Sequence, residues 1–263
     1  MTIAGSDSGG GAGIQADLKT FQALGVYGAS TLTAITAQNT VGVTAVHEVP
    51  TEVIAAQIDA VVDDIGVDAA KTGMLSSAAI IATVAERIRH WRLDRLVVDP
   101  VMVAKSGDRL LREDAVDALI RDLLPLATVL TPNLPEAEVL VGRALETDDD
   151  VRQAAREIVG LGTRSVVMKG GHRLGARAVD LLFDGQNFTL FESERFDTPN
   201  THGTGCTFSA AIAAGLARGL EIVEAVGEAK RYVSEAIRRS QPLGAGHGPV
   251  AHDWLLSRQS LRD

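Results

Sequence analysis

Short apolar runs alternate with amphipathic segments along most of the chain. In the first amphipathic segment, residues 13–24, the apolar side chains of Ile14, Leu18 and Phe21 recur at helical spacing. Residues 51–65 repeat this pattern after a threonine that can cap a helix. The same spacing predicts further helices over residues 76–91, 113–124, 148–161, 204–218 and 222–239.

The stretches between these helices are rich in β-branched and aliphatic residues, which is typical of buried strands. After a first strand at the N-terminus, they cover residues 30–36, 68–70, 95–98, 128–130, 165–168, 178–183 and 188–191. Strand–helix alternation over more than half of the chain predicts parallel βαβ units. Near Asp184-Gly185 the pattern changes to that of a hairpin. We therefore predict an α/β fold whose mainly parallel sheet has an antiparallel edge.

Length and composition narrow the architecture further. The chain has 263 residues, of which 46% are hydrophobic and only 4% aromatic, so the core is expected to be aliphatic. We find no internal repeat, no low-complexity segment and no composition shift that would mark a linker. The prediction is a single domain over residues 1–263.

The charge and the single cysteine limit the possible partners and location. The formal net charge is −9 and there is no long Lys/Arg run, so we expect no binding to nucleic acid or to anionic membranes. A lone cysteine, Cys206, excludes an intrachain disulfide and fits a reducing compartment. No apolar run approaches the roughly 18 residues of a membrane span. The N-terminus lacks the features of a signal peptide. The expected location is the cytoplasm.

Polar clusters follow six of the predicted strands. In open α/β sheets, ligands bind beyond the carboxyl ends of the strands, so these clusters are expected to meet around one site. They cover residues 5–13, 36–40, 71–75, 99–102, 131–136 and 169–172.

Residues 200–209 place two glycines and the lone cysteine at the start of a predicted helix. The first N–H groups of a helix have no intrahelical partners, and the helix dipole adds positive charge, so this turn can bind an anion. A helix N-terminus can also lower the pKa of Cys206 from about 8.5 towards neutrality. Cys206 is then either a general base in phosphate chemistry or a small residue packed under the helix start.

Several familiar sites are absent from the sequence. The glycine run of residues 5–13 is not a dinucleotide fingerprint, because Ile14 stands where the last glycine would be, and no Walker A motif occurs. There is no HExxH and no G-x-S-x-G, and the six histidines show no metal-binding spacing. The glycine run is either a flexible turn or a pocket floor formed by backbone. Asp17, one helical turn beyond Gly13, either points into that pocket or is a solvated helix charge.

Several side chains at the strand ends suit particular ligands. Asp99 and Glu136 offer the carboxylate oxygens that Mg²⁺ prefers, and Lys169, followed by two glycines, can contact a phosphate. Gln38 presents a donor and an acceptor on one planar face, which suits a heteroaromatic ring with an amino group. Met74 can cover such a ring with its sulfur. Each has a competing structural interpretation. Asp99 and Glu136 could be turn or helix-cap residues, and Lys169 could be a surface lysine. Gln38 could cap the strand end, and Met74 could fill the core.

Taken in order, these motifs resemble the hydroxymethylpyrimidine (phosphomethylpyrimidine) kinases of thiamine biosynthesis, which belong to the ribokinase-like superfamily. The resemblance covers essentially the whole chain. The segments that carry it are residues 4–19, 36–40, 71–75, 99–102, 131–137 and 203–209.

The resemblance implies a three-layer α/β/α fold and an ATP- and Mg²⁺-dependent kinase that forms a homodimer. Such an enzyme would phosphorylate the hydroxymethyl group of 4-amino-5-hydroxymethyl-2-methylpyrimidine and then convert the monophosphate to the pyrophosphate.

The resemblance also implies roles for individual residues. Gln38 would recognise the aminopyrimidine, in a ring site lined by Asp17, Gly5, Met74 and Val101. Asp99 and Glu136 would serve Mg²⁺ and phosphate. Cys206 would be the base, where most sugar kinases of the superfamily carry aspartate, in an anion hole formed with Gly203, Thr204 and Gly205. The ATP site would include Asn133, Lys169, Thr204 and Lys230.

Two other functions remain open at this point. A pyridoxal or pyridoxine kinase of the same fold would act on a similar substituted ring with a hydroxymethyl group. The second is a non-catalytic regulator that binds a nucleotide or a pyrimidine, but the combination of Asp99, Glu136, Lys169 and Cys206 argues against it. An NAD-dependent oxidoreductase is excluded by the glycine spacing.

Overall fold

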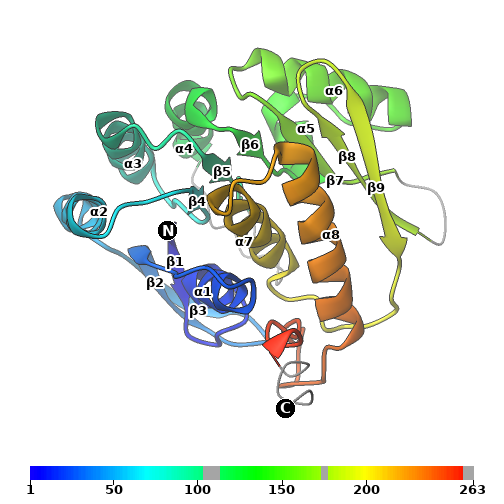
Figure 1. The fold of residues 1–263 in the computed structure, drawn as a ribbon, viewed down its shortest axis with the longest axis horizontal. Helices are drawn as coiled ribbons and strands as arrows, with labels where there is room; N and C mark the ends of the chain where they lie inside the picture. The colour runs from blue at the N-terminus through cyan, green and yellow to red at the C-terminus, as the bar shows by residue number, and fades with distance from the viewer. Residues whose placement is uncertain (103–112, 173–176, 257–263) are drawn as a thin grey trace.

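The strands form a single sheet in the computed structural model, which describes residues 1–102, 113–172 and 177–256 (Figure 1). The order across the sheet is β3-β2-β1-β4-β5-β6-β7-β8-β9. The strands are β1 (Thr2–Asp7), β2 (Ser30–Gln38), β3 (Val43–Glu48), β4 (Ala70–Thr72), β5 (Leu96–Val98), β6 (Val129–Leu130), β7 (Val166–His172), β8 (Arg177–Phe183) and β9 (Phe188–Glu194). The run β2-β1-β4-β5-β6-β7 is parallel throughout, which confirms the predicted mainly parallel sheet.

Both edges of this sheet are antiparallel, whereas only one such edge was expected. The hairpin at Asp184-Gly185 joins β8 and β9 as predicted, and β8 also pairs antiparallel with β7. At the opposite edge, β3 pairs antiparallel with β2. Strand β3 was not predicted because residues 44–47 are all exposed and so show no apolar alternation.

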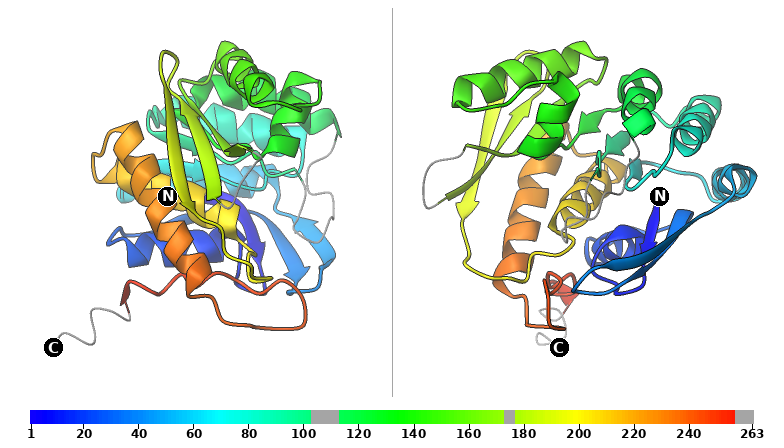
Figure 2. Two further views of the ribbon diagram at one scale, coloured as in Figure 1. Left: turned by 90° about the vertical axis from the view of Figure 1, so that its right-hand side faces the viewer. Right: turned by 180° about the vertical axis from the view of Figure 1, so that it is seen from behind.

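Helices cover both faces of the sheet, which confirms the three-layer arrangement (Figures 1 and 2). One face carries α1 (Gly13–Ala23), α7 (Thr204–Ala217) and α8 (Ile222–Arg238). The other carries α2 (Thr51–Asp64), α3 (Ala78–Trp91), α4 (Glu113–Ala118), α5 (Leu134–Val141) and α6 (Asp148–Gly160). Helix α4 continues into a π-helical turn, Leu119–Leu123, and a 3₁₀ turn at Leu124–Leu126. None of the helices in the described residues is both long and apolar enough to cross a membrane.

The central strands are buried on both faces, and their side chains supply two separate cores. Val97, Val129 and Val167 pack towards α7 and α8, whereas Leu96 and Leu130 pack towards the opposite helix layer. Each fully buried aliphatic side chain contributes roughly 1.5–3 kcal/mol to the free energy of folding. This aliphatic packing holds the carboxyl ends of the parallel strands at one edge of the sheet, next to the start of α7.

Candidate functional site

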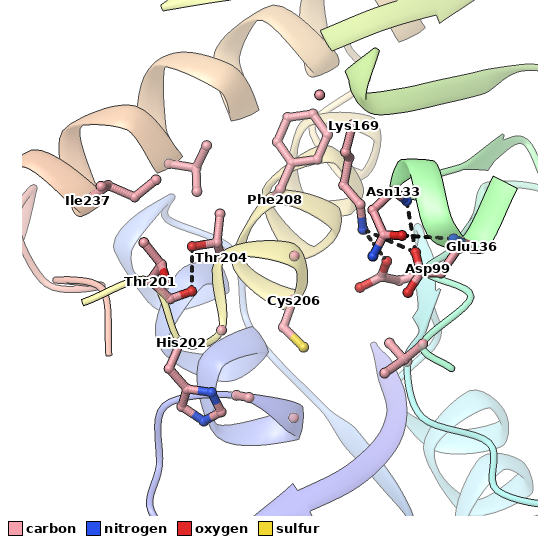
Figure 3. Close-up of a pocket in the computed structure, with 18 of the residues that line it drawn as sticks. Asp99, Asn133, Glu136, Lys169, Thr201, His202, Thr204, Cys206, Phe208 and Ile237 are labelled. Carbon is pink, nitrogen blue, oxygen red and sulfur yellow. Dashed lines mark hydrogen bonds and ion pairs between the residues drawn. The ribbon is translucent and has the colours of Figure 1, made fainter. Parts of the chain in front are cut away.

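A cavity of about 930 Å³ lies where the parallel strands end and α7 begins (Figure 3). Every residue that the sequence singled out for the site lines this cavity, with the exception of Asp17. Those residues are Gly5, Gln38, Met74, Asp99, Val101, Asn133, Glu136, Lys169, Gly203, Thr204, Gly205, Cys206 and Lys230. The structure thus brings together side chains that are up to 225 residues apart in the chain, from Gly5 to Lys230.

The start of α7 has the backbone geometry of an anion site. Gly203 precedes the helix with a φ of 77°, a left-handed conformation that favours glycine. A Cβ on Gly203 would lie 1.8 Å from the carbonyl oxygen of Gly11, so no other residue fits there. The Thr204 hydroxyl donates a 2.7 Å hydrogen bond to the carbonyl oxygen of Thr201 and fixes the entry to the helix. Gly203, Thr204 and Gly205 line the cavity, so the N–H groups of this first turn that have no intrahelical partner are available to an anion there.

Cys206 follows directly in this first turn, but its thiol is not acidic. Burial raises the pKa of Cys206 to about 11, although the ammonium of Lys71 lowers it. The carboxylates of Asp17 and Asp99 raise it further. The expectation that the helix N-terminus would bring this pKa towards neutrality is therefore wrong, because desolvation outweighs the favourable charges.

Asp17 lies behind the cavity, which corrects its predicted place in the ring site. Its side chain is completely buried in a salt bridge with Lys71, at 2.9 Å. It also accepts a 2.6 Å hydrogen bond from the hydroxyl of Thr2. Burial alone would lower the pKa of Lys71, but Asp17 raises it above its ordinary value, so the lysine stays charged. Lys71 is a charged residue of the site that sequence reasoning did not assign, because its partner is distant in the chain.

Asp99, Lys169 and Glu136 form a compact charged cluster (Figure 3). Asp99 directly follows β5, Glu136 lies in the first turn of α5, and Lys169 lies within β7. The ammonium of Lys169 lies 2.8 Å from Asp99 Oδ1 and 3.9 Å from Glu136 Oε2. Burial would raise the pKa of Asp99, but Lys169 and Lys71 hold it below its ordinary value. Burial raises the pKa of Glu136 despite Lys169. Glu136 also closes a capping box with Asn133, which orients both side chains at the start of α5.

Lys230 reaches the cavity from α8 and is held by a carboxylate that the sequence did not reveal. Its ammonium lies 2.8 Å from Asp180 Oδ2, and both side chains are largely buried. Asp180 accepts a second hydrogen bond, of 2.8 Å, from the N–H of Gly170. The pair therefore links α8 and β8 to the backbone directly after Lys169.

Gln38 stands at the end of β2, where the antiparallel hairpin with β3 begins. The Ser8 hydroxyl donates to its carbonyl oxygen at 2.7 Å and accepts from its N–H at 2.8 Å, which ties β2 to the glycine run. Gly5 and Met74 lie close together in the wall, because a Cβ on Gly5 would be 2.6 Å from the terminal carbon of Met74. At this point the cavity wall therefore consists of the backbone of Gly5 and the thioether of Met74.

Asp7 and His202 were also not among the predicted site residues, yet both line the cavity. His202 Nε2 lies 2.9 Å from Asp7 Oδ2. The signal that could have pointed to them is a carboxylate inside the glycine run of residues 5–13 and a histidine directly before Gly203.

Comparisons with known proteins agree with this geometry. The model of the family described as phosphomethylpyrimidine kinase matches residues 7–251. A hydroxymethylpyrimidine/phosphomethylpyrimidine kinase of Rhizobium meliloti is 56% identical over 255 residues, which are 96% of each chain. The thiamine biosynthesis bifunctional protein ThiED of Geobacter sulfurreducens is 54% identical over 263 residues, and the chain spans about half of its length, 53%.

A solved structure shows the same fold. The structure of an ADP complex of Bacillus subtilis pyridoxal kinase aligns with a TM-score of 0.89 and 48% sequence identity, over 97% of both chains.

Proposed function

Because the chain belongs to the phosphomethylpyrimidine kinase family, we propose that it phosphorylates 4-amino-5-hydroxymethyl-2-methylpyrimidine and then the resulting monophosphate, with ATP as donor. A member of this family is a phosphotransferase. The observation that carries the proposal is that Gln38, the anion site at Gly203 and the cluster around Lys169 all line one cavity. The continuous sheet further supports one domain over the whole chain.

The acceptor is proposed to lie between Gln38 and Cys206. Gln38 would pair with the ring nitrogen and the amino group, and the wall at Gly5, Met74 and Val101 would contact the ring faces. The hydroxymethyl oxygen then attacks the γ-phosphorus, the bond to the leaving oxygen of ADP breaks, and the hydroxyl proton moves to Cys206 Sγ. Since the pKa of the thiol is about 11, only its minor thiolate form can accept this proton.

The donor side of the cavity supports ATP. Lys169 and Lys230 bring two ammonium groups to it, and Asn133 and Thr204 add polar side chains. Phosphoryl transfer depends mainly on positioning and on neutralising charge, which these cations and the helix N–H groups supply.

The carboxylates of this site fit Mg²⁺ as a shared cofactor. Asp99 and Glu136 carry two formal negative charges against the single positive charge of Lys169, which leaves one uncompensated. Among the described residues, no group of three or more His, Cys, Asp or Glu side chains could hold a metal ion. Mg²⁺ commonly binds one or two carboxylates together with substrate phosphates. Asp99 and Glu136 would therefore hold it only with ATP, where it would neutralise phosphate charge.

The test of the proposed function is a product assay. The purified chain is incubated with ATP, Mg²⁺ and the hydroxymethylpyrimidine, and the monophosphate and the pyrophosphate are resolved. Formation of both supports the proposal. Turnover of pyridoxal alone would assign the second candidate, with which the structural similarity to the Bacillus subtilis pyridoxal kinase is consistent. ATP binding without transfer to either ring would indicate a regulator.

The chain is proposed to form a homodimer in the cytoplasm. Strand β3 is an outer strand of the sheet, and Ile35, Val41 and Val46 are exposed on or beside it. Exposed apolar edge strands favour pairing with a second copy. Light scattering coupled to gel filtration should give a dimer mass, which Ile35→Glu should reduce to that of a monomer. A monomer for the unchanged chain would contradict the proposal, and cell fractionation tests the location.

A further inference from the structure

The carboxylate of Asp7 is the centre of four hydrogen bonds at the end of β1. Oδ1 accepts from the N–H of Gly9 at 2.8 Å, and Oδ2 accepts from those of Gly11 at 3.0 Å and Ala12 at 2.8 Å. The fourth partner is His202 Nε2, 2.9 Å from Oδ2. Burial would raise the pKa of Asp7, but His202 and the backbone N–H groups hold it below its ordinary value. Because an ionised carboxylate only accepts, Nε2 of His202 is the nitrogen that carries the hydrogen.

His202 is fixed in place by the backbone around it. Its N–H donates to the carbonyl oxygen of Gly248 at 3.0 Å, and its own carbonyl oxygen accepts from Val250 at 3.4 Å. Its ring packs on the glycine run, because a Cβ on Gly11 would come 2.5 Å from His202 Cδ2. At the next residue, Gly203, a Cβ would lie 1.8 Å from the carbonyl oxygen of Gly11, so these two backbones are also in close contact. The glycine run and the start of α7 therefore contact each other without an intervening side chain.

The same glycine run is attached at its other end to the proposed ring site. Ser8, the residue after Asp7, exchanges hydrogen bonds with both backbone groups of Gln38. The N–H of Asp7 donates to the side-chain oxygen of Gln15 at 2.9 Å, which anchors the run to α1. A continuous path of short contacts thus joins Gln38 to Asp7, His202 and Gly203.

We propose that Asp7 and His202 are positioning residues that hold the acceptor ring site and the anion site in fixed register. The inference rests on the proposed kinase function, in which the hydroxymethyl oxygen and the γ-phosphate must be aligned at about 3–3.5 Å. The hydrogen bonds of the Asp7 carboxylate run to backbone N–H groups and to His202, and none of them runs to Gln38 or to the charged cluster at Lys169. Loss of the pair should therefore reduce the rate of transfer while each substrate still binds.

The test is a double-mutant cycle of His202→Ala, Asp7→Ala and the double variant. His202→Ala removes the side-chain hydrogen bond between the two sites but leaves the backbone contact of Gly11 with Gly203 and the three backbone hydrogen bonds of Asp7. We expect kcat to fall about 100-fold, since a displacement near 1 Å costs this much, with less than about threefold change in the dissociation constants of the pyrimidine and of ADP. The double variant should be no slower than the slower single variant.

Two further variants separate positioning from a purely structural role. His202→Gln retains an N–H donor that can reach Asp7, and it should recover part of the lost kcat. Asp184→Ala is the matched control, because Asp184 also accepts from two backbone N–H groups, in the β8–β9 turn outside the cavity lining. It should leave kcat unchanged even where it lowers the unfolding midpoint.

The proposal is overturned if His202→Ala keeps its kcat and loses only stability, or if the two single effects multiply in the double variant. Failure of the proposed kinase function can be told apart from failure of this proposal, because the unchanged chain would then form no phosphorylated pyrimidine. If the unchanged chain phosphorylates pyridoxal, the same cycle is measured with pyridoxal.

Discussion

Lys71, which lines the cavity, forms a completely buried salt bridge with Asp17 behind it. Lys71 Nζ lies 3.0 Å from one carboxylate oxygen of Asp17 and 2.9 Å from the other, and both side chains have no exposed surface. Neither charge can be solvated by water, so each depends on the other. The pair also places a cation near Cys206, where it opposes the effect of burial on the thiol pKa.

Removal of Asp17 should therefore affect folding first. Asp17→Ala leaves the Lys71 ammonium buried without its partner, which should lower the free energy of unfolding by about 3–5 kcal/mol in urea titrations. Asp122→Ala is the matched control, because Asp122 pairs with Arg121 at the surface and its loss should change stability little. Unchanged stability of Asp17→Ala together with a raised KM for the pyrimidine would restore Asp17 to the ring site.

The raised pKa of Cys206 predicts how activity depends on pH. Below a pKa of about 11, the thiolate fraction rises tenfold for each pH unit. If the thiolate is the base, kcat should rise with pH by up to about tenfold per unit between pH 7 and 9 when proton transfer limits the rate. The measurement is a series of initial rates at saturating ATP and pyrimidine.

Two variants at this position complete that experiment. Cys206→Ala should largely abolish transfer and leave pyrimidine binding intact, because only the proton acceptor is removed. Cys206→Asp provides the carboxylate of the sugar kinases, so it should be active with a flatter pH profile in this range. Near-normal turnover of Cys206→Ala would identify the cysteine as a packing residue.

Gln38→Leu tests recognition of the ring. The change removes the amide donor and acceptor at the end of β2 and keeps a similar volume. We expect KM for the pyrimidine to rise about tenfold, the effect of losing a hydrogen-bonding partner worth about 1.4 kcal/mol, with little change in KM for ATP. Equal increases in both constants would remove Gln38 from the ring site.

Most of the fold could be predicted because its signals are local. The aliphatic strands around Val97 and Val129 are buried on both faces, and the helices between them carry apolar stripes, so residue spacing alone identifies them. The hairpin at Asp184-Gly185 has its own turn signal. Strand β3 lacks any such signal, because its side chains are mostly exposed and show no apolar alternation. Only its backbone pairing with β2 makes it a strand.

The sequence predicted which residues lie together in the candidate site better than it predicted their pKa values and ion pairs. Motifs at strand ends brought Asp99, Glu136 and Lys169 together, because parallel strands end at one edge. The pKa of Cys206 depends on burial by distant segments, and no spacing rule contains that information. The pairing of Asp7 with His202, 195 residues away, is equally non-local.

Asp180 should control the affinity for ATP through Lys230. Asp180 Oδ2 holds the Lys230 ammonium at 2.8 Å, at the side of the cavity assigned to the phosphates. Lys230→Met removes a charged contact worth about 1.5–3 kcal/mol, so the dissociation constant for ADP should rise roughly 10- to 100-fold, as measured by calorimetry. Asp180→Asn keeps one acceptor and should show a smaller rise. Arg231→Met, at the adjacent exposed position of α8, is the control and should bind ADP normally. Normal ADP binding by Lys230→Met would show that this lysine serves only to neutralise Asp180.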